Sequence, residues 1–122
     1  MTEEEWGEAA DELLGRERYY GMDGEPLTWR QWSERRMENP DARRVALTKI
    51  GNYEVSTVLL GIDHRFSRSG PPIIFETMIF DQTGITDDSL GNEVFCDRYT
   101  NKVAALAGHD QACERARRRD FE

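Results

Sequence analysis

Residues 45–60 read VALTKIGNYEVSTVLL, and this stretch decides the fold class. Two runs rich in β-branched residues, 45–50 and 53–60, lie on either side of the pair Gly51–Asn52. A two-residue Gly/Asn connection between such runs is typical of a tight β-hairpin. The stretch therefore predicts two antiparallel strands that belong to one sheet.

The two-residue turn also predicts the register of this hairpin, because it places the residues that flank the turn opposite each other. The expected cross-strand pairs are Ile50 with Tyr53, Lys49 with Glu54, and Val45 with Val58. The Lys49–Glu54 pair would bring opposite charges together, which supports this register.

Two further strands and a helix are expected after the hairpin. The run 73–80 is apolar on both faces except at Glu76 and Thr77, which is typical of a central strand. A shorter strand over 93–99 follows, and Thr100 can cap a helix over 101–118. The expected apolar stripe of this helix consists of Val103, Leu106, Ala107 and Cys113.

Two helices are expected before the hairpin. Thr2 and Glu5 form one capping-box pattern, ahead of a helix that ends near Gly15. Thr28 and Gln31 form another, ahead of a helix over 29–38. The sequence thus predicts an α+β fold, an antiparallel four-stranded meander with a C-terminal helix packed on it and an N-terminal helical pair. A single domain over 1–122 is expected, with parts 1–40, 44–100 and 101–118.

Charge and composition exclude several classes of protein. The 122 residues carry a formal net charge of −8, which disfavours direct binding to nucleic acid. No apolar run is long enough for a membrane span, and no basic and apolar leader begins the chain. Two cysteines suggest a reducing compartment, so the cytoplasm is expected. The phosphate-loop, dinucleotide-binding, nucleophile-elbow, Cys-x-x-Cys and EF-hand patterns are missing, and no cofactor is expected.

Glu76 is the first candidate site residue. It lies between Ile74 and Met78 on one side of an apolar strand, where a carboxylate must find donors or shift its pKa upward. Such carboxylates concentrate at functional sites. The alternative is a glutamate at a strand end or a sheet edge that reaches water or an arginine.

The two histidines, His64 and His109, are the next candidates. If they converged with Glu76, two imidazoles and a carboxylate could hold a metal ion or perform acid–base chemistry. No local metal-binding spacing supports this convergence. The alternative is that each imidazole is hydrogen-bonded within the fold.

Charged residues of the loop 61–72 complete the candidate site. Arg65 and Arg68 could hold a phosphate or carboxylate through two hydrogen bonds each. Asp63, directly before His64, joins them as a candidate ligand-binding residue. Solvated loop arginines are the commoner case.

Several segments resemble a family of small uncharacterised proteins encoded by bacteriophages and actinobacterial prophages. The matching segments are VSTVLLGIDH at 55–64, GPPIIFETMIF at 70–80, RYT at 98–100 and AGH at 107–109. The resemblance covers residues 19–112 and includes Asp63, His64, Glu76 and His109. It implies a phage-encoded protein that is dispensable for virion building and acts on the host. The acidic extension 1–16 departs from the family pattern.

Together these observations favour a non-enzymatic binding module in the host cytoplasm. Its partner would be a host protein or a small nucleotide-like ligand, held against the loop 61–72 and the last helix. The alternative is a small metal-assisted hydrolase that uses His64, Glu76 and His109. An acidic mimic of DNA is a weaker alternative, and self-association stays open.

Overall fold

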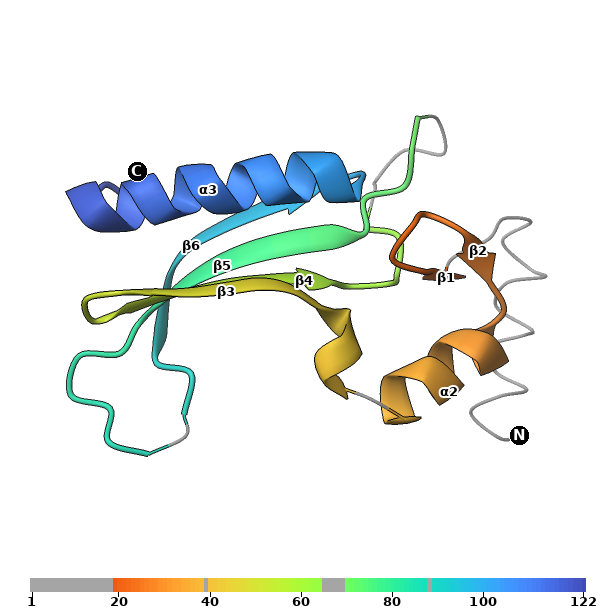
Figure 1. The fold of residues 1–122 in the computed structure, drawn as a ribbon, viewed down its shortest axis with the longest axis horizontal. Helices are drawn as coiled ribbons and strands as arrows, with labels where there is room; N and C mark the ends of the chain where they lie inside the picture. The colour runs from red at the N-terminus through yellow and green to blue at the C-terminus, as the bar shows by residue number, and fades with distance from the viewer. Residues whose placement is uncertain (1–18, 39, 65–69, 88) are drawn as a thin grey trace.

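The computed structural model describes residues 19–38, 40–64, 70–87 and 89–122. Four antiparallel strands form the main sheet in the order β3-β4-β5-β6 (Figure 1). Their bounds are Arg44–Ile50 for β3, Tyr53–Leu59 for β4, Phe75–Asp81 for β5 and Asn92–Tyr99 for β6. Each strand pairs with the next along the chain, so the predicted meander is confirmed. The apolar β5 occupies a central place, as its sequence predicted.

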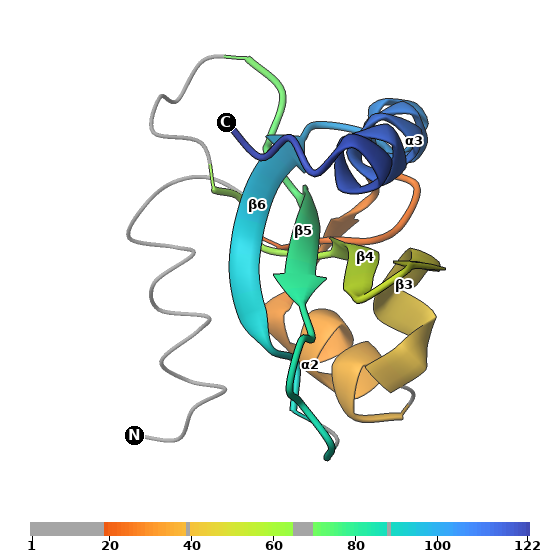
Figure 2. The same cartoon turned by 90° about the vertical axis from the view of Figure 1, so that its left-hand side faces the viewer.

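The C-terminal helix α3, Lys102–Arg118, lies across one face of this sheet and contacts all four strands (Figure 2). Two groups of buried side chains fill the interface. The group at one end includes Leu59, Phe75 and Ala105, and the group at the other includes Val55, Ile79 and Ala112. The predicted packing of a helix on a four-stranded sheet is confirmed, and the fold is α+β.

The described part of the chain before the sheet contains one helix of the expected pair, with the predicted bounds 29–38, and a small hairpin that was not predicted. Two short strands, β1 (Tyr19–Tyr20) and β2 (Pro26–Leu27), pair with each other ahead of the helix α2 (Trp29–Glu38). A short 3-10 helix, η1 (Pro40–Arg43), then leads into β3. The first expected helix, between Thr2 and Gly15, lies outside the described residues.

The capping box of α2 is confirmed atom by atom. The Gln31 backbone N–H donates to Thr28 Oγ1 at 3.1 Å, and the Thr28 backbone N–H donates to Gln31 Oε1 at 3.0 Å. These reciprocal bonds satisfy two backbone donors that a helix start leaves without partners. They fix where α2 begins.

The hairpin register is confirmed next to the turn and wrong at the far end. Ile50 faces Tyr53 and Lys49 faces Glu54, as predicted. Val58, however, pairs with Arg44, because a β-bulge between Arg44 and Ala46 inserts Val45 as an extra residue. The prediction assumed an unbroken two-residue repeat, which a bulge interrupts.

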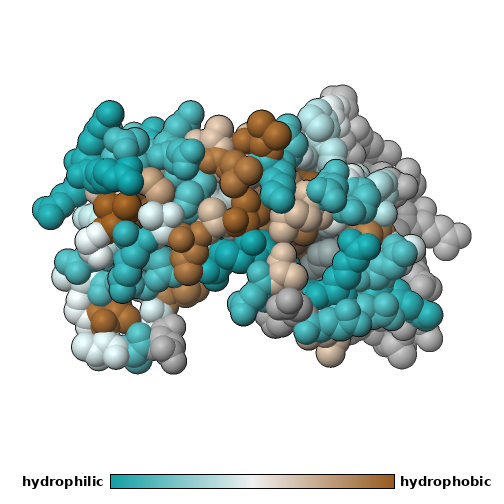
Figure 3. All heavy atoms as spheres, in the orientation of Figure 1, coloured by the Kyte–Doolittle hydropathy of each residue, from teal (hydrophilic) through white to brown (hydrophobic). Residues whose placement is uncertain are grey.

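The N-cap of α3 and its buried face both differ from the predicted ones. Asn101, and not Thr100, is the N-cap, since its side chain accepts a hydrogen bond from the Ala104 backbone N–H at 2.8 Å. Val103 is 79% exposed and Leu106 43% exposed, and apolar atoms are visible along α3 in Figure 3.

The buried face of α3 instead consists of Ala105, Gly108, His109, Ala112, Cys113 and Ala116. Of the expected stripe only Cys113 belongs to it. Small residues let the helix axis approach the sheet closely, and there is no room for the larger side chains of Val103 and Leu106 at this interface. Within the described ranges, no helix combines the length and apolarity needed to cross a bilayer.

Candidate functional site

His109 is the centre of a row of polar side chains between α3 and the sheet. Its Nε2 lies 2.9 Å from Thr48 Oγ1 on β3, and its Nδ1 lies 2.7 Å from Thr57 Oγ1 on β4. Thr57 Oγ1 is in turn 2.5 Å from Thr77 Oγ1 on β5. A hydrogen bond between Thr77 and the hydroxyl of Tyr99 extends the row to β6. We call this set of five residues the hydroxyl row; it takes one residue from every strand.

The centre of the hydroxyl row is closed to solvent, whereas Thr48 and Tyr99 at its ends are partly exposed. His109 is 4% exposed, and Thr57 and Thr77 are 0% exposed. A buried histidine whose two ring nitrogens both have hydrogen-bond partners is satisfied without a ligand. The geometry therefore supports the structural alternative for His109, because a substrate has no access to its imidazole.

The burial of His109 in the hydroxyl row predicts that stability depends on pH. Burial lowers the pKa of His109 from its usual 6.5, and the Asp110 carboxylate opposes this shift only in part. Below about pH 6.5 the unfolded chain then binds a proton that the folded chain does not, so stability falls as the pH drops through this range. We expect urea denaturation of the wild type to show this loss between about pH 7.5 and about pH 5.5. In His109→Gln the loss should shrink, and an equal loss in both proteins would contradict the assignment.

Glu76 lies on the opposite face of the sheet from His109. Its neighbour Thr77 faces α3, and successive side chains of a strand point to opposite faces. Its Oε2 accepts a hydrogen bond from Arg98 Nε at 2.9 Å, and Cys96 Sγ lies 3.6 Å from the same oxygen. The carboxylate thus has an arginine partner, as the alternative reading predicted, and it does not converge with His109.

The thiol of Cys96 beside Glu76 is not activated. The pKa of Cys96 is raised to about 11, mainly by partial desolvation and secondly by the negative charge of Glu76. The thiol stays protonated at neutral pH and is a poor nucleophile.

Asp63 and His64, two candidate site residues of the loop 61–72, make hydrogen bonds to the backbone just before β5. Asp63 Oδ1 accepts a hydrogen bond from the Ile73 backbone N–H at 3.2 Å, and the His64 backbone N–H donates to the Ile73 carbonyl at 2.9 Å. Arg65 and Arg68 lie outside the described residues. In the part of the chain that the structure describes, no three His, Cys, Asp or Glu side chains group as a metal site would require.

A pocket of about 220 Å³ lies between the β1–β2 hairpin, α2, η1 and the end of β4. Its apolar lining includes Tyr20, Met22, Leu27, Trp32 and Leu59. Its charged lining consists of Arg35, Arg36 and Arg43, and no Asp or Glu occurs among the described lining residues. We call it the arginine pocket. An apolar pocket with a few convergent polar groups is the usual form of a ligand site.

Arg43, a lining residue of this pocket, carries an unsatisfied donor. Its Nε is buried, and among the described residues it has no hydrogen-bond partner. Burying such a donor without a partner costs about 1–3 kcal/mol, more for a charged group. Unsatisfied groups of this kind are an indication of a missing ion or ligand.

Trp32 is held firmly in the wall of the arginine pocket. Its ring centroid lies 5.2 Å from that of Tyr19, and the Arg36 guanidinium carbon lies 5.2 Å from the Trp32 ring centre. Gly61, at φ 74°, packs so closely on the indole that a Cβ there would overlap it. The aromatic side chains around residue 32 thus form a small packed cluster that supports the pocket.

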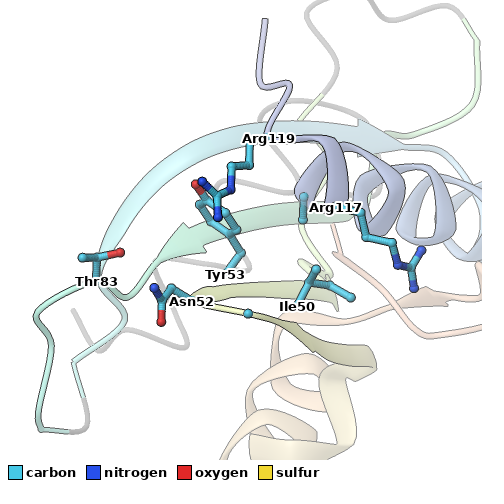
Figure 4. A pocket seen from close by; sticks show the side chains of 8 residues that line it. Ile50, Asn52, Tyr53, Thr83, Arg117 and Arg119 are labelled. Atoms are coloured by element: carbon cyan, nitrogen blue, oxygen red, sulfur yellow. The ribbon is translucent and has the colours of Figure 1, made fainter.

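A second pocket, also of about 220 Å³, lies at the hairpin end of the sheet (Figure 4). Figure 4 shows Arg119 reaching over the Tyr53 ring, while Arg117 points to another side. Arg117 pairs with Glu114, and the Thr83 hydroxyl donates to Asp81 Oδ1 at 2.7 Å. Carboxylates therefore accompany the cationic and polar groups here, as the Glu25 carboxylate does beside Gly21 in the arginine pocket. The arginine pocket differs in that one of its lining residues, Arg43, has a buried donor without a partner among the described residues.

Sequence reasoning selected Glu76 and His109 but missed the groups around them. The signal for the hydroxyl row was present, since Thr48, Thr57 and Thr77 each interrupt an apolar strand face. The arginine pocket had a weaker signal, the accumulation of arginines between residues 30 and 44. Comparisons with family models, with curated proteins and with solved structures found no match to this chain.

Proposed function

We propose that this chain is a binding module whose arginine pocket takes an anionic group attached to an apolar body. The buried Nε of Arg43, without a partner among the described residues, is the observation that supports this proposal most directly. An anion there would accept a charge-assisted hydrogen bond, which is stronger than a neutral one. Arg35 and Arg36 add positive charge to the same lining.

The surroundings of the arginine pocket favour binding over catalysis. Its described lining holds arginine guanidinium groups and apolar side chains, but no carboxylate, imidazole or thiol that could act as base or nucleophile. The histidine that could transfer protons, His109, is enclosed in the hydroxyl row. The resemblance to phage-encoded proteins makes a host component the proposed source of the ligand.

Phenyl phosphate, an anion on a small apolar ring, is the probe for this proposal. We expect its addition to shift the Arg43 Nε–Hε resonance in nitrogen-proton correlation spectra, since that group is the buried donor. Arg43→Lys keeps the charge but removes the donor and should weaken binding about tenfold or more.

Arg44→Gln is the matched control, because Arg44 is exposed, adjacent in sequence and not part of the pocket lining. This variant should bind the probe within about twofold of the wild type. Equal losses in both variants would show a general charge effect. An unchanged Arg43 resonance at saturating probe would contradict the proposal.

A further inference from the structure

We propose that the natural occupant of the arginine pocket is one apolar side chain of a protein partner, flanked in that partner by acidic residues. This inference rests on the proposed function and narrows its ligand to an acidic peptide segment. It replaces the nucleotide-like ligand expected from the sequence.

The size of the arginine pocket is the first argument. Small-molecule sites usually measure about 300–1,000 Å³, whereas this pocket measures about 220 Å³. A leucine side chain can enter a pocket of this size as a whole, whereas most of a nucleotide would project out of it into solvent.

The lining of the arginine pocket is the second argument. Leu27, Leu59 and Met22 offer aliphatic contact, which suits an apolar side chain. A nucleobase would instead require an open aromatic face for stacking. The Trp32 ring already contacts Tyr19 and the Arg36 guanidinium, so a base could stack on it only by displacing one of them.

The charge and exposure of α2 are the third argument. No residue of α2 is buried, although the helix supplies two of the three pocket arginines. Met37, next to Arg36, is 80% exposed, and hydrophilic side chains cover the region of α2 in Figure 3. Arginine and methionine are enriched in protein interfaces, and the three pocket arginines form a local positive charge that complements an acidic segment, although the chain as a whole carries a net charge of −8.

The experiment uses a fluorescent five-residue peptide with leucine at its centre and two acidic residues on each side. Two matched peptides replace the leucine by serine, or the acids by their amides. We expect each replacement to weaken binding about tenfold or more, because one removes the apolar anchor and the other its charges. Two protein variants should also weaken binding of the leucine peptide about tenfold or more. Arg43→Lys changes a pocket guanidinium, and Ala42→Phe places a large side chain in the pocket. Arg44→Gln should change this binding less than about twofold.

The results separate this inference from the proposed function. If phenyl phosphate shifts the Arg43 resonance but the leucine and serine peptides bind equally, the peptide inference is wrong and the proposed function stands. If adenosine monophosphate displaces the leucine peptide and binds more tightly, a small nucleotide is the occupant and the inference is overturned. If neither probe nor peptide binds, both proposals fail.

Discussion

Gly108→Ala is expected to destabilise the protein by about 1–3 kcal/mol, the usual cost of overpacking a filled core. In an ordinary helix the same change stabilises by up to about 1 kcal/mol, because alanine restricts the unfolded chain. Here a Cβ at position 108 would overlap the hydroxyl and ring of Tyr99. The ring belongs to Tyr99 of β6, so the ring, the helix or the strand has to shift to make room for the Cβ.

Urea denaturation of Gly108→Ala measures this effect against Ala107→Gly as the control. Ala107 is exposed on the same turn, and its replacement should cost only the propensity difference of about 1 kcal/mol. A Gly108→Ala protein as stable as the wild type would show that α3 does not approach the sheet as closely as described.

Thr57→Val is expected to have an effect at least as large, since one oxygen serves two partners. Valine has nearly the same shape, but it leaves His109 Nδ1 and the Thr77 hydroxyl without the Thr57 oxygen. Each buried group that loses its partner costs about 1–3 kcal/mol. The free energy of unfolding should therefore fall steeply although the packing volume is conserved.

A double variant distinguishes the lost hydrogen bonds from a packing defect. Thr57→Val combined with His109→Leu removes both members of the Thr57–His109 hydrogen bond, so the imidazole is no longer left without a partner, and part of the stability lost in Thr57→Val should be recovered. Thr86→Val, in an exposed loop, should stay within about 0.5 kcal/mol of the wild type. If Thr57→Val matched Thr86→Val, the hydroxyl row would not contribute to stability.

Local rules predicted the elements whose determinants are close in sequence. The hairpin turn fixes its neighbouring pairs, Ile50–Tyr53 and Lys49–Glu54, and the Thr28–Gln31 capping box fixes the start of α2. The alternating pattern of residues gives no sign of the bulge at Val45, so the predicted pairing of Val45 with Val58 was wrong.

The buried face of α3 could not be predicted from apolar residues alone. Val103 and Leu106 are larger and more apolar than Gly108 and Ala112, but the sheet selects residues small enough for close approach. Periodicity identifies a stripe, whereas the contact surface of the partner decides which stripe is buried.

The candidate site shows the same limit. Strand alternation alone places Glu76 opposite to Thr77, yet the position of His109 required knowing which face α3 covers. Arg98, the cross-strand partner of Glu76, became identifiable only with the register of β5 and β6. The arginine pocket joins residues from five segments, and no single segment carries its signature.

The hydroxyl row also bears on errors during folding. If β4 slipped by one residue against its neighbours, Thr57 would turn away from α3 and Ser56 or Val58 would take its place. A purely aliphatic interface would tolerate several such misalignments, because contacts between aliphatic side chains have no preferred direction. The bonds through His109 are directional and join side chains of four strands and one helix, so a misaligned state has to re-form them with other side chains or lose them, which disfavours it.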